Sequence, residues 1–228
     1  MSIIAALISH RDGMVASDGR IFAPALLENG RVVRTATIES DTFDKTFAIG
    51  NGQVIGAFAG LVRFSGKTVA DHILEIGTDS LNQRHDLGSL GDDLQRAIRM
   101  RLQLIDRDEV IFSERRLDVL LAAGEKLSRA EMRIVSLRFF PNADQIISET
   151  DTVVAQTTNR YYLRGDDQAI DVAKSAFMTV QASRCDAESM HETVVNVVQA
   201  GIEASGIHKY GSAKDCGGQI FVRRTWYG

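Results

Sequence analysis

The sequence has few of the residues that cross-link or interrupt a chain. Only two prolines occur among 228 residues, and the two cysteines, Cys185 and Cys216, lie far apart without the spacing of a zinc ligand pair. This pattern argues against a disulfide framework and favours a reducing compartment, so we expect a cytoplasmic protein. We expect no bound metal and no cofactor, because the five histidines are equally dispersed, at positions 10, 72, 85, 191 and 208.

Long apolar runs and an excess of basic charge are also missing. The N-terminal apolar run, residues 3–8, has no basic segment before it and is broken at His10, so it predicts neither a signal peptide nor a membrane span. Lysine and arginine total 26 against 30 acidic residues, which gives a formal net charge of −4. The arginines are scattered along the chain. Nucleic acid and membranes are therefore disfavoured as partners.

The overall composition is that of an ordinary globular protein. Hydrophobic residues make up 44% of the chain and charged residues 25%. A chain of this length buries about 70% of the surface that it exposes when unfolded, which is enough for a sizeable core. Because no linker, repeat or low-complexity segment interrupts the sequence, we expect a single domain over residues 1–228.

The chain places a strand at its beginning. Chain ends usually fray unless they are tied down, so the apolar run 3–8 predicts that this end lies inside the fold. A polar turn ending in Gly13 separates this run from residues 14–17, and together they predict a hairpin. Ser2, directly before the first strand, is therefore expected at a defined place in the structure.

Further along the chain, strands and helices come in blocks. An Asn51-Gly52 pair between residues 45–50 and 53–60 predicts a second hairpin. Residues 31–38 alternate weakly and predict a short edge strand or a projecting hairpin. Apolar spacing predicts helices at 61–77, 91–106, 168–181 and 188–204, and further strands at 117–123, 131–140, 144–147, 152–156 and 217–224.

Blocks of strands followed by blocks of helices favour antiparallel sheets with the helices outside them. The order here is four strands, two helices, a group of strands, two helices and a last strand. We therefore predict an α+β fold in which two antiparallel sheets stack face to face and a helix layer covers each outer face, a four-layer αββα sandwich.

Four short features in register resemble the proteasome β-subunit family of N-terminal nucleophile (Ntn) hydrolases and its bacterial relatives. They are Ser2 before the first strand, the Asp18-x-Arg20 pair about sixteen residues later, Lys45 opening a strand, and Gly60 closing the next strand before a helix. The spacing from Ser2 to Asp18 fits this family without a gap, whereas Arg20 to Lys45 contains an insertion of about a dozen residues. The element order extends the resemblance over nearly the whole chain.

These residue types suit one kind of chemistry. A serine hydroxyl is a weak nucleophile until a base takes its proton, and an N-terminal serine has its own α-amine for that purpose, with a pKa of about 7.7–8.0. Once Met1 is removed, Ser2 is expected to serve as nucleophile and base. A buried Lys45 ammonium would lower the pKa of the amine, Asp18 would pair with Lys45, and the backbone N–H of Gly60 would meet the oxyanion.

The C-terminal motif of the family is only partly present. The family has Asp-x-x-Ser-Gly-Gly before its last strands, where the Asp and Ser hold the terminal amine, whereas this chain has residues 213–218, Ala-Lys-Asp-Cys-Gly-Gly. Asp215 and Ser212 are the two candidates for holding the amine. Residues 161–166, Tyr-Tyr-Leu-Arg-Gly-Asp, stand where the family has Gly-Ser-Gly.

The resemblance implies a hydrolase that cleaves peptide or amide bonds through an acyl-enzyme and assembles into a homo-oligomeric ring or helical stack. Peptides or proteins are the implied substrates, residues 21–44 the expected pocket wall, and a regulatory ATPase is not readable from the sequence. Alternatives are a non-catalytic assembly subunit, in which Lys45 and Asp18 form only a structural ion pair, and an amidase or transpeptidase using the same Ser2. In each version Arg20 is expected to fix the turn after Asp18.

Overall fold

The computed structural model describes residues 2–23, 25–29, 31–83, 86–104, 116–124, 132–141, 146–155, 158–180 and 186–225. Within these ranges the first sheet has the strand order β14-β1-β2-β15, and every neighbouring pair is antiparallel. Its strands are β14 (Arg160–Gly165), β1 (Ile3–Ile8), β2 (Gly13–Asp18) and β15 (Ile220–Arg224). The predicted N-terminal hairpin is confirmed, and its first strand lies in the interior of the sheet.

Strand β1 is apolar throughout because both of its faces are buried. Ile4, Ala6 and Ile8 pack against the second sheet, whereas the alternate residues, Ile3 and Leu7 among them, pack under the helices. Side chains alternate between the two faces of a strand, so a strand covered on both sides needs apolar residues at every position. Burial on both faces ties down this end of the chain.

The second sheet is also antiparallel, with the order β13-β12-β11-β8-β7. Strands β7 (Thr46–Ile49) and β8 (Val54–Gly60) form the hairpin predicted at Asn51-Gly52. Positive φ angles at Gly50, Asn51 and Gly52 explain why glycine and asparagine occupy this turn. The remaining strands are β11 (Leu117–Gly124), β12 (Met132–Pro141) and β13 (Ile146–Ala155).

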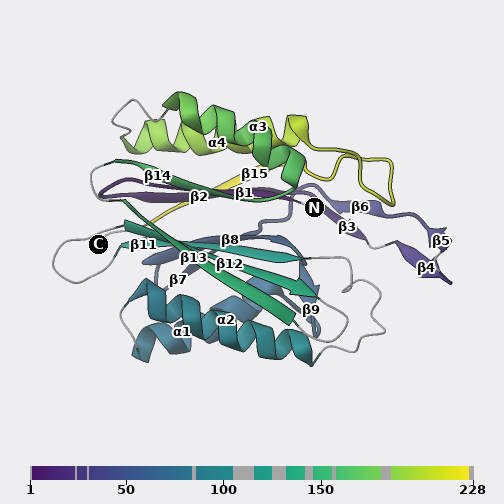
Figure 1. Cartoon of the computed structure of the whole chain (residues 1–228), viewed down its shortest axis with the longest axis horizontal. Helices are drawn as coiled ribbons and strands as arrows, with labels where there is room; N and C mark the ends of the chain where they lie inside the picture. Colours follow the sequence, from purple (N-terminus) through teal and green to yellow (C-terminus); the bar gives the residue numbers. More distant parts are fainter. Residues whose placement is uncertain are drawn as a thin grey trace.

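Helices cover the outer faces of the two sheets, and the inner faces meet (Figure 1). Helices α3 (Asp167–Val180) and α4 (Ala187–Ala204) pack on the first sheet through one apolar cluster. Helices α1 (Val69–Gln83) and α2 (Leu87–Gln103) pack on the second sheet through another. The prediction of an α+β fold with antiparallel sheets and four helices is confirmed.

Helix α1 begins later than the helix predicted at 61–77. Residues after Gly60 form a small hairpin of β9 (Arg63–Phe64) and β10 (Lys67–Thr68) instead. Thr68 then caps the helix, because its hydroxyl accepts the N–H of Asp71 at 3.1 Å while the Asp71 carboxylate accepts the N–H of Thr68 at 3.0 Å. This reciprocal capping sets a start that apolar spacing alone does not reveal.

Other boundaries also differ from the sequence-based expectation. Helix α2 starts at Leu87 because Asp86 caps it, accepting the N–H of Ser89 at 2.8 Å. The two short strands predicted at 144–147 and 152–156 belong to one strand, β13. Strand β14 was not predicted. Residues 105–106, 131, 144–145, 156 and 181, at the edges of predicted elements, lie outside the described residues, as do Met1, His85 and Cys185.

A narrow arm extends from the end of the sheets near the N-terminus (Figure 1). Strands β3 (Ile21–Ala23) and β6 (Thr37–Ser40) pair at its base, and β4 (Leu26–Glu28) and β5 (Arg31–Arg34) pair further out. All four residues of β5 are exposed. Of the two structures predicted for residues 31–38, a short edge strand or a projecting hairpin, the protein has the projecting hairpin.

Candidate active site

Ser2 is held by backbone contacts at the start of β1. Its side chain is buried, and its carbonyl oxygen accepts the N–H of Asp166 at 2.9 Å. Gly165 lies against the same carbonyl with φ +122°, and a Cβ atom there would come 1.8 Å from the Ser2 oxygen. Only glycine fits this close approach. The β14–α3 junction therefore sets the position of Ser2.

Lys45 reaches Ser2 from the residue before β7. Its ammonium nitrogen lies 2.7 Å from Ser2 Oγ, 3.1 Å from Asp18 Oδ1 and 2.6 Å from the carbonyl oxygen of Arg20. These three acceptors match the three N–H bonds of an ammonium group. Since Lys45 is fully buried, its charge is directed at the Ser2 hydroxyl with no exposure to solvent.

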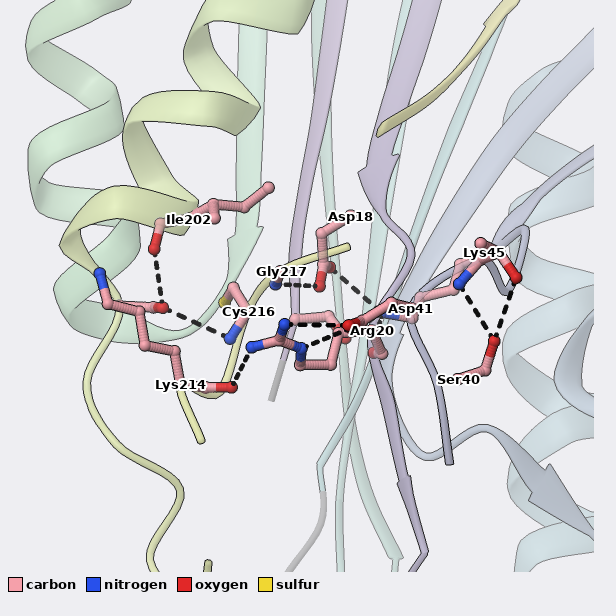
Figure 2. Close-up of polar contacts among 12 residues, drawn as sticks. Asp18, Arg20, Ser40, Asp41, Lys45, Ile202, Lys214, Cys216 and Gly217 are labelled. Carbon is pink, nitrogen blue, oxygen red and sulfur yellow. Dashed lines mark hydrogen bonds and ion pairs between the residues drawn. The ribbon is translucent and has the colours of Figure 1, made fainter. Parts of the chain in front are cut away.

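Asp18, at the end of β2, balances the charge of Lys45. Its Oδ1 atom also accepts the N–H of Ile3 at 3.0 Å, and its Oδ2 atom accepts the N–H of Gly217 at 3.0 Å. Figure 2 shows the Gly217 N–H directed at the Asp18 carboxylate. Asp18 thereby connects the beginning of β1, the buried lysine and the segment that leads into β15.

Removing this ion pair from water is costly. Transferring an ammonium and a carboxylate into a protein interior costs several kcal/mol per ion, and the pair offsets that cost only when its remaining hydrogen bonds are made. Side-chain exposure is 1% for Lys45 and 0% for Asp18, and both groups are fully hydrogen-bonded in the way this requires. Such a pair is a poor way to gain stability. Here its ammonium group is in direct contact with the Ser2 hydroxyl.

Arg20 organises the loop around this centre without touching Ser2. Its guanidinium makes two hydrogen bonds to Asp41, at 2.6 and 3.2 Å, and a third to the carbonyl of Lys214 at 3.2 Å (Figure 2). The carboxylate of Asp41 raises the pKa of Arg20. A Cβ atom on Gly217 would come 2.5 Å from the guanidinium carbon, so the group lies flat against this glycine. The structure thus places Arg20 at the turn after Asp18.

Gly60 ends β8 in a conformation that other residues avoid. Its φ angle is +90°, and a Cβ atom would come 1.8 Å from the carbonyl oxygen of Arg116. The carbonyl of Lys45 accepts the N–H of Phe58 at 3.1 Å, two residues before Gly60. Gly60 therefore lies about 7 Å along the strand from Phe58, the residue that binds the backbone carbonyl of Lys45.

The two candidates for holding the amine, Ser212 and Asp215, differ in exposure, and only Asp215 is buried. Ser212 is exposed. Asp215 is directed toward His208, with 3.9 Å between the ring nitrogen Nε2 and Oδ1. Cys216 is fully buried, and burial together with the negative charge of Asp18 raises the pKa of its thiol, which stays protonated.

Sequence reasoning missed Asp166 as a contact of Ser2. Besides donating its N–H to the Ser2 carbonyl, Asp166 caps α3, because its Oδ1 atom accepts the N–H of Ala169 at 2.9 Å. The sequence indicates only the capping role of its side chain, because an aspartate three residues before an apolar helical run is typical of a helix cap. The backbone contact follows from strand pairing and has no sequence signature.

Within the described residues, no group of three or more His, Cys, Asp or Glu side chains is arranged to hold a metal ion. Among the helices described, none is long and apolar enough to cross a membrane. No protein-family model matches the chain, and no curated protein matches it. The function must therefore be argued from the geometry around Ser2, Lys45 and Asp18.

Proposed function

We propose that this protein is an N-terminal nucleophile hydrolase that cleaves peptide or amide bonds with Ser2, and that its helix and sheet layers form the four-layer αββα fold of the proteasome β-subunit family. The observation that carries the proposal is the fully buried Lys45 ammonium, 2.7 Å from Ser2 Oγ and paired with a fully buried Asp18. A positive charge at this position stabilises a serine oxygen as it loses its proton.

The first half of the reaction forms an acyl-enzyme. The α-amine of Ser2 accepts the hydroxyl proton while Oγ attacks the carbonyl carbon of the substrate, and the carbonyl oxygen becomes an oxyanion. The Gly60 N–H is the proposed donor to that oxyanion. When the tetrahedral intermediate collapses, the amine passes its proton to the leaving nitrogen and the C–N bond breaks. Ser2 is left as an ester.

The second half releases the product. Water attacks the ester carbonyl while the α-amine takes one of its protons, and the proton then returns to Oγ as the C–O bond breaks. In an amidase or transpeptidase the same ester forms, and in a transpeptidase an amine takes the place of water. Both halves require a neutral amine on Ser2, so the bond between Met1 and Ser2 must first be cleaved.

The decisive experiment combines the intact mass of the protein with covalent labelling by a peptide epoxyketone. In this probe the ketone carbon is attacked by a hydroxyl and the epoxide carbon by an amine, so both groups of one N-terminal residue are consumed in forming a ring. We expect a chain that begins at Ser2, one equivalent of label on that residue, and no label on Ser2→Ala. A Ser2→Ala variant that hydrolyses peptides as fast as the wild type would refute the proposal.

One observation also suits the alternative of a non-catalytic assembly subunit. The Lys45 and Asp18 side chains bind the N–H of Ile3, the N–H of Gly217 and the carbonyl of Arg20, and so join three segments at one end of the sheets. A chain that retains Met1, takes no label and forms a stable homo-oligomer would favour this alternative. Assembly into a ring or helical stack is part of both proposals.

A further inference from the structure

A buried carboxylate near the proposed active site holds two arginines. Asp118, on β11, is 1% exposed. Its Oδ2 atom accepts the Arg116 Nε–H at 2.8 Å, and its Oδ1 atom accepts the Arg138 Nε–H at 2.7 Å. Both arginine side chains are 18% exposed. With respect to Asp118, the two arginines are therefore closely matched in contact and burial.

Of these two arginines, Arg116 is the one that also contacts the other sheet among the described residues. Its Nη2–H donates to the carbonyl of Gly165 at the end of β14, and its Nη1 and Nη2 atoms both lie 3.3 Å from Asp167 Oδ1 at the start of α3. Gly165 is the residue packed against the Ser2 carbonyl. The guanidinium of Arg116 thus binds the junction that positions Ser2.

The backbone of Arg116 binds the other side of the proposed site. Its carbonyl oxygen accepts the N–H of Leu61 at 3.3 Å and occupies the space that a Cβ atom on Gly60 would need. One residue therefore contacts both Gly60, the proposed oxyanion donor, and Gly165, which lies against the nucleophile. Both of these contacts are with the glycines and not with Ser2.

We infer that Arg116 is a positioning residue that sets the distance between the Gly60 backbone and Ser2, an inference that rests on the proposed function. The planar guanidinium suits this role because it donates several hydrogen bonds in fixed directions, which a flexible ammonium cannot do. Attack and oxyanion stabilisation require both groups in place at once. A displacement of about 1 Å at such a site reduces the rate about 100-fold.

The test compares Arg116→Met with Arg138→Met in the full chain. Each variant removes one arginine from Asp118 and leaves the other. We expect Arg116→Met to reduce kcat for a fluorogenic peptide, and the rate of labelling by the peptide epoxyketone, about 100-fold with KM changed less than about threefold. Arg138→Met is expected to retain kcat within about threefold. Equal losses in the two variants would overturn the inference.

Arg116→Lys keeps the experiment informative if Arg116→Met does not fold. The lysine keeps a charge beside Asp118 but cannot serve Asp118, Asp167 and the Gly165 carbonyl together. We expect thermal unfolding close to that of Arg138→Met and a kcat at least about tenfold below wild type. A wild-type kcat in Arg116→Lys would show that charge alone suffices and would also overturn the inference.

The positioning role and the proposed function fail in different ways. If the wild-type protein takes no label and hydrolyses no peptide, the proposed function fails and the role of Arg116 with it. If the wild type is labelled on Ser2 and Arg116→Met is labelled at the same rate, only the positioning role fails. Labelling rate is the useful readout because a purely structural contribution of Arg116 would alter thermal unfolding without altering that rate.

Discussion

Two groups of charged residues in this protein each pair basic side chains with a carboxylate, but one group is buried and the other is exposed to solvent. In one, Lys45 and Asp18 are 1% and 0% exposed and meet at Ser2. In the other, at the protein surface, Glu75 of α1 binds Lys67 of β10 and Arg101 of α2, and the three side chains are 44%, 50% and 35% exposed. The hydrogen bonds from Lys67 and Arg101 lower the pKa of Glu75.

The difference shows where charge is retained in spite of its cost. Solvent screens the surface group, and exposed ion pairs add little to the free energy of unfolding. The buried group was removed from water at a cost of several kcal/mol per ion, and every N–H of its ammonium is used. A hydrophobic pair of similar volume would stabilise the fold at least as well. In the proposed function, the buried charges act on the Ser2 hydroxyl, which lies 2.7 Å from the ammonium nitrogen.

The largest expected effect comes from removing the buried lysine. Lys45→Met leaves Asp18 charged and unpaired in the interior, so we expect the free energy of unfolding to fall by about 3–5 kcal/mol. Peptide hydrolysis should fall by at least about 10³-fold as charge stabilisation at Oγ is lost. Urea denaturation and initial rates measure both. Lys67→Met is the surface control and should unfold like the wild type, and equal destabilisation of the two variants would contradict the comparison.

Neutralising the buried Asp18 should shift the pH dependence of kcat/KM. Asp18→Asn keeps the shape but leaves the buried Lys45 ammonium without its carboxylate, and its amide N–H₂ group faces a backbone N–H where a carboxylate oxygen had accepted one. We expect a loss of about 3 kcal/mol in the free energy of unfolding. A negative charge favours a protonated amine, so its removal lowers the pKa of the Ser2 amine. The rise of kcat/KM with pH should therefore occur at lower pH than in the wild type. An unchanged or upward-shifted profile would show that the amine is not the base.

Gly60 and Gly66 allow a crowded backbone position to be compared with an open one. Both have positive φ, +90° and +77°, but a Cβ atom on Gly60 would meet the Arg116 carbonyl at 1.8 Å, whereas nothing lies within 4 Å of one on Gly66. Gly66→Ala should cost about 1 kcal/mol of unfolding free energy, from backbone strain alone. Gly60→Ala should cost more, about 2–3 kcal/mol, and should reduce kcat. If the thermal melting curves of Gly60→Ala and Gly66→Ala coincide, the predicted effect of crowding at Gly60 is contradicted.

The smallest effect is expected at a surface cap. Asp86→Ala removes the cap of α2 and should cost about 1 kcal/mol. Hydrogen bonds from Ser89 lower the pKa of Asp86, so its contribution is present above the unfolded pKa of about 4 and is lost as the pH falls through the lower folded value. The difference between the variant and the wild type should therefore shrink below pH 4. A difference that is constant from pH 7 to pH 2 would contradict this.

The sequence by itself determined the elements whose signals are local. Strand β1 follows from six consecutive apolar residues, and the β7–β8 hairpin from Asn51-Gly52. The resemblance to the proteasome β-subunit family was enough to propose Ser2, Asp18 and Lys45 as a group, and the structure brings their side chains together. The start of α1 was misplaced because the capping contacts of Thr68 and Asp71 determine it, and a short hairpin precedes it.

Only the tertiary structure decided which backbone groups surround the site. Asp166 and Gly165 reach Ser2 because β14 pairs with β1. Arg116 reaches Gly165 because the two sheets stack with these strand ends adjacent. Local propensity leaves a pattern in the amino-acid sequence, whereas a hydrogen bond between segments far apart in the chain depends on sheet order and register, which only packing of the complete chain determines.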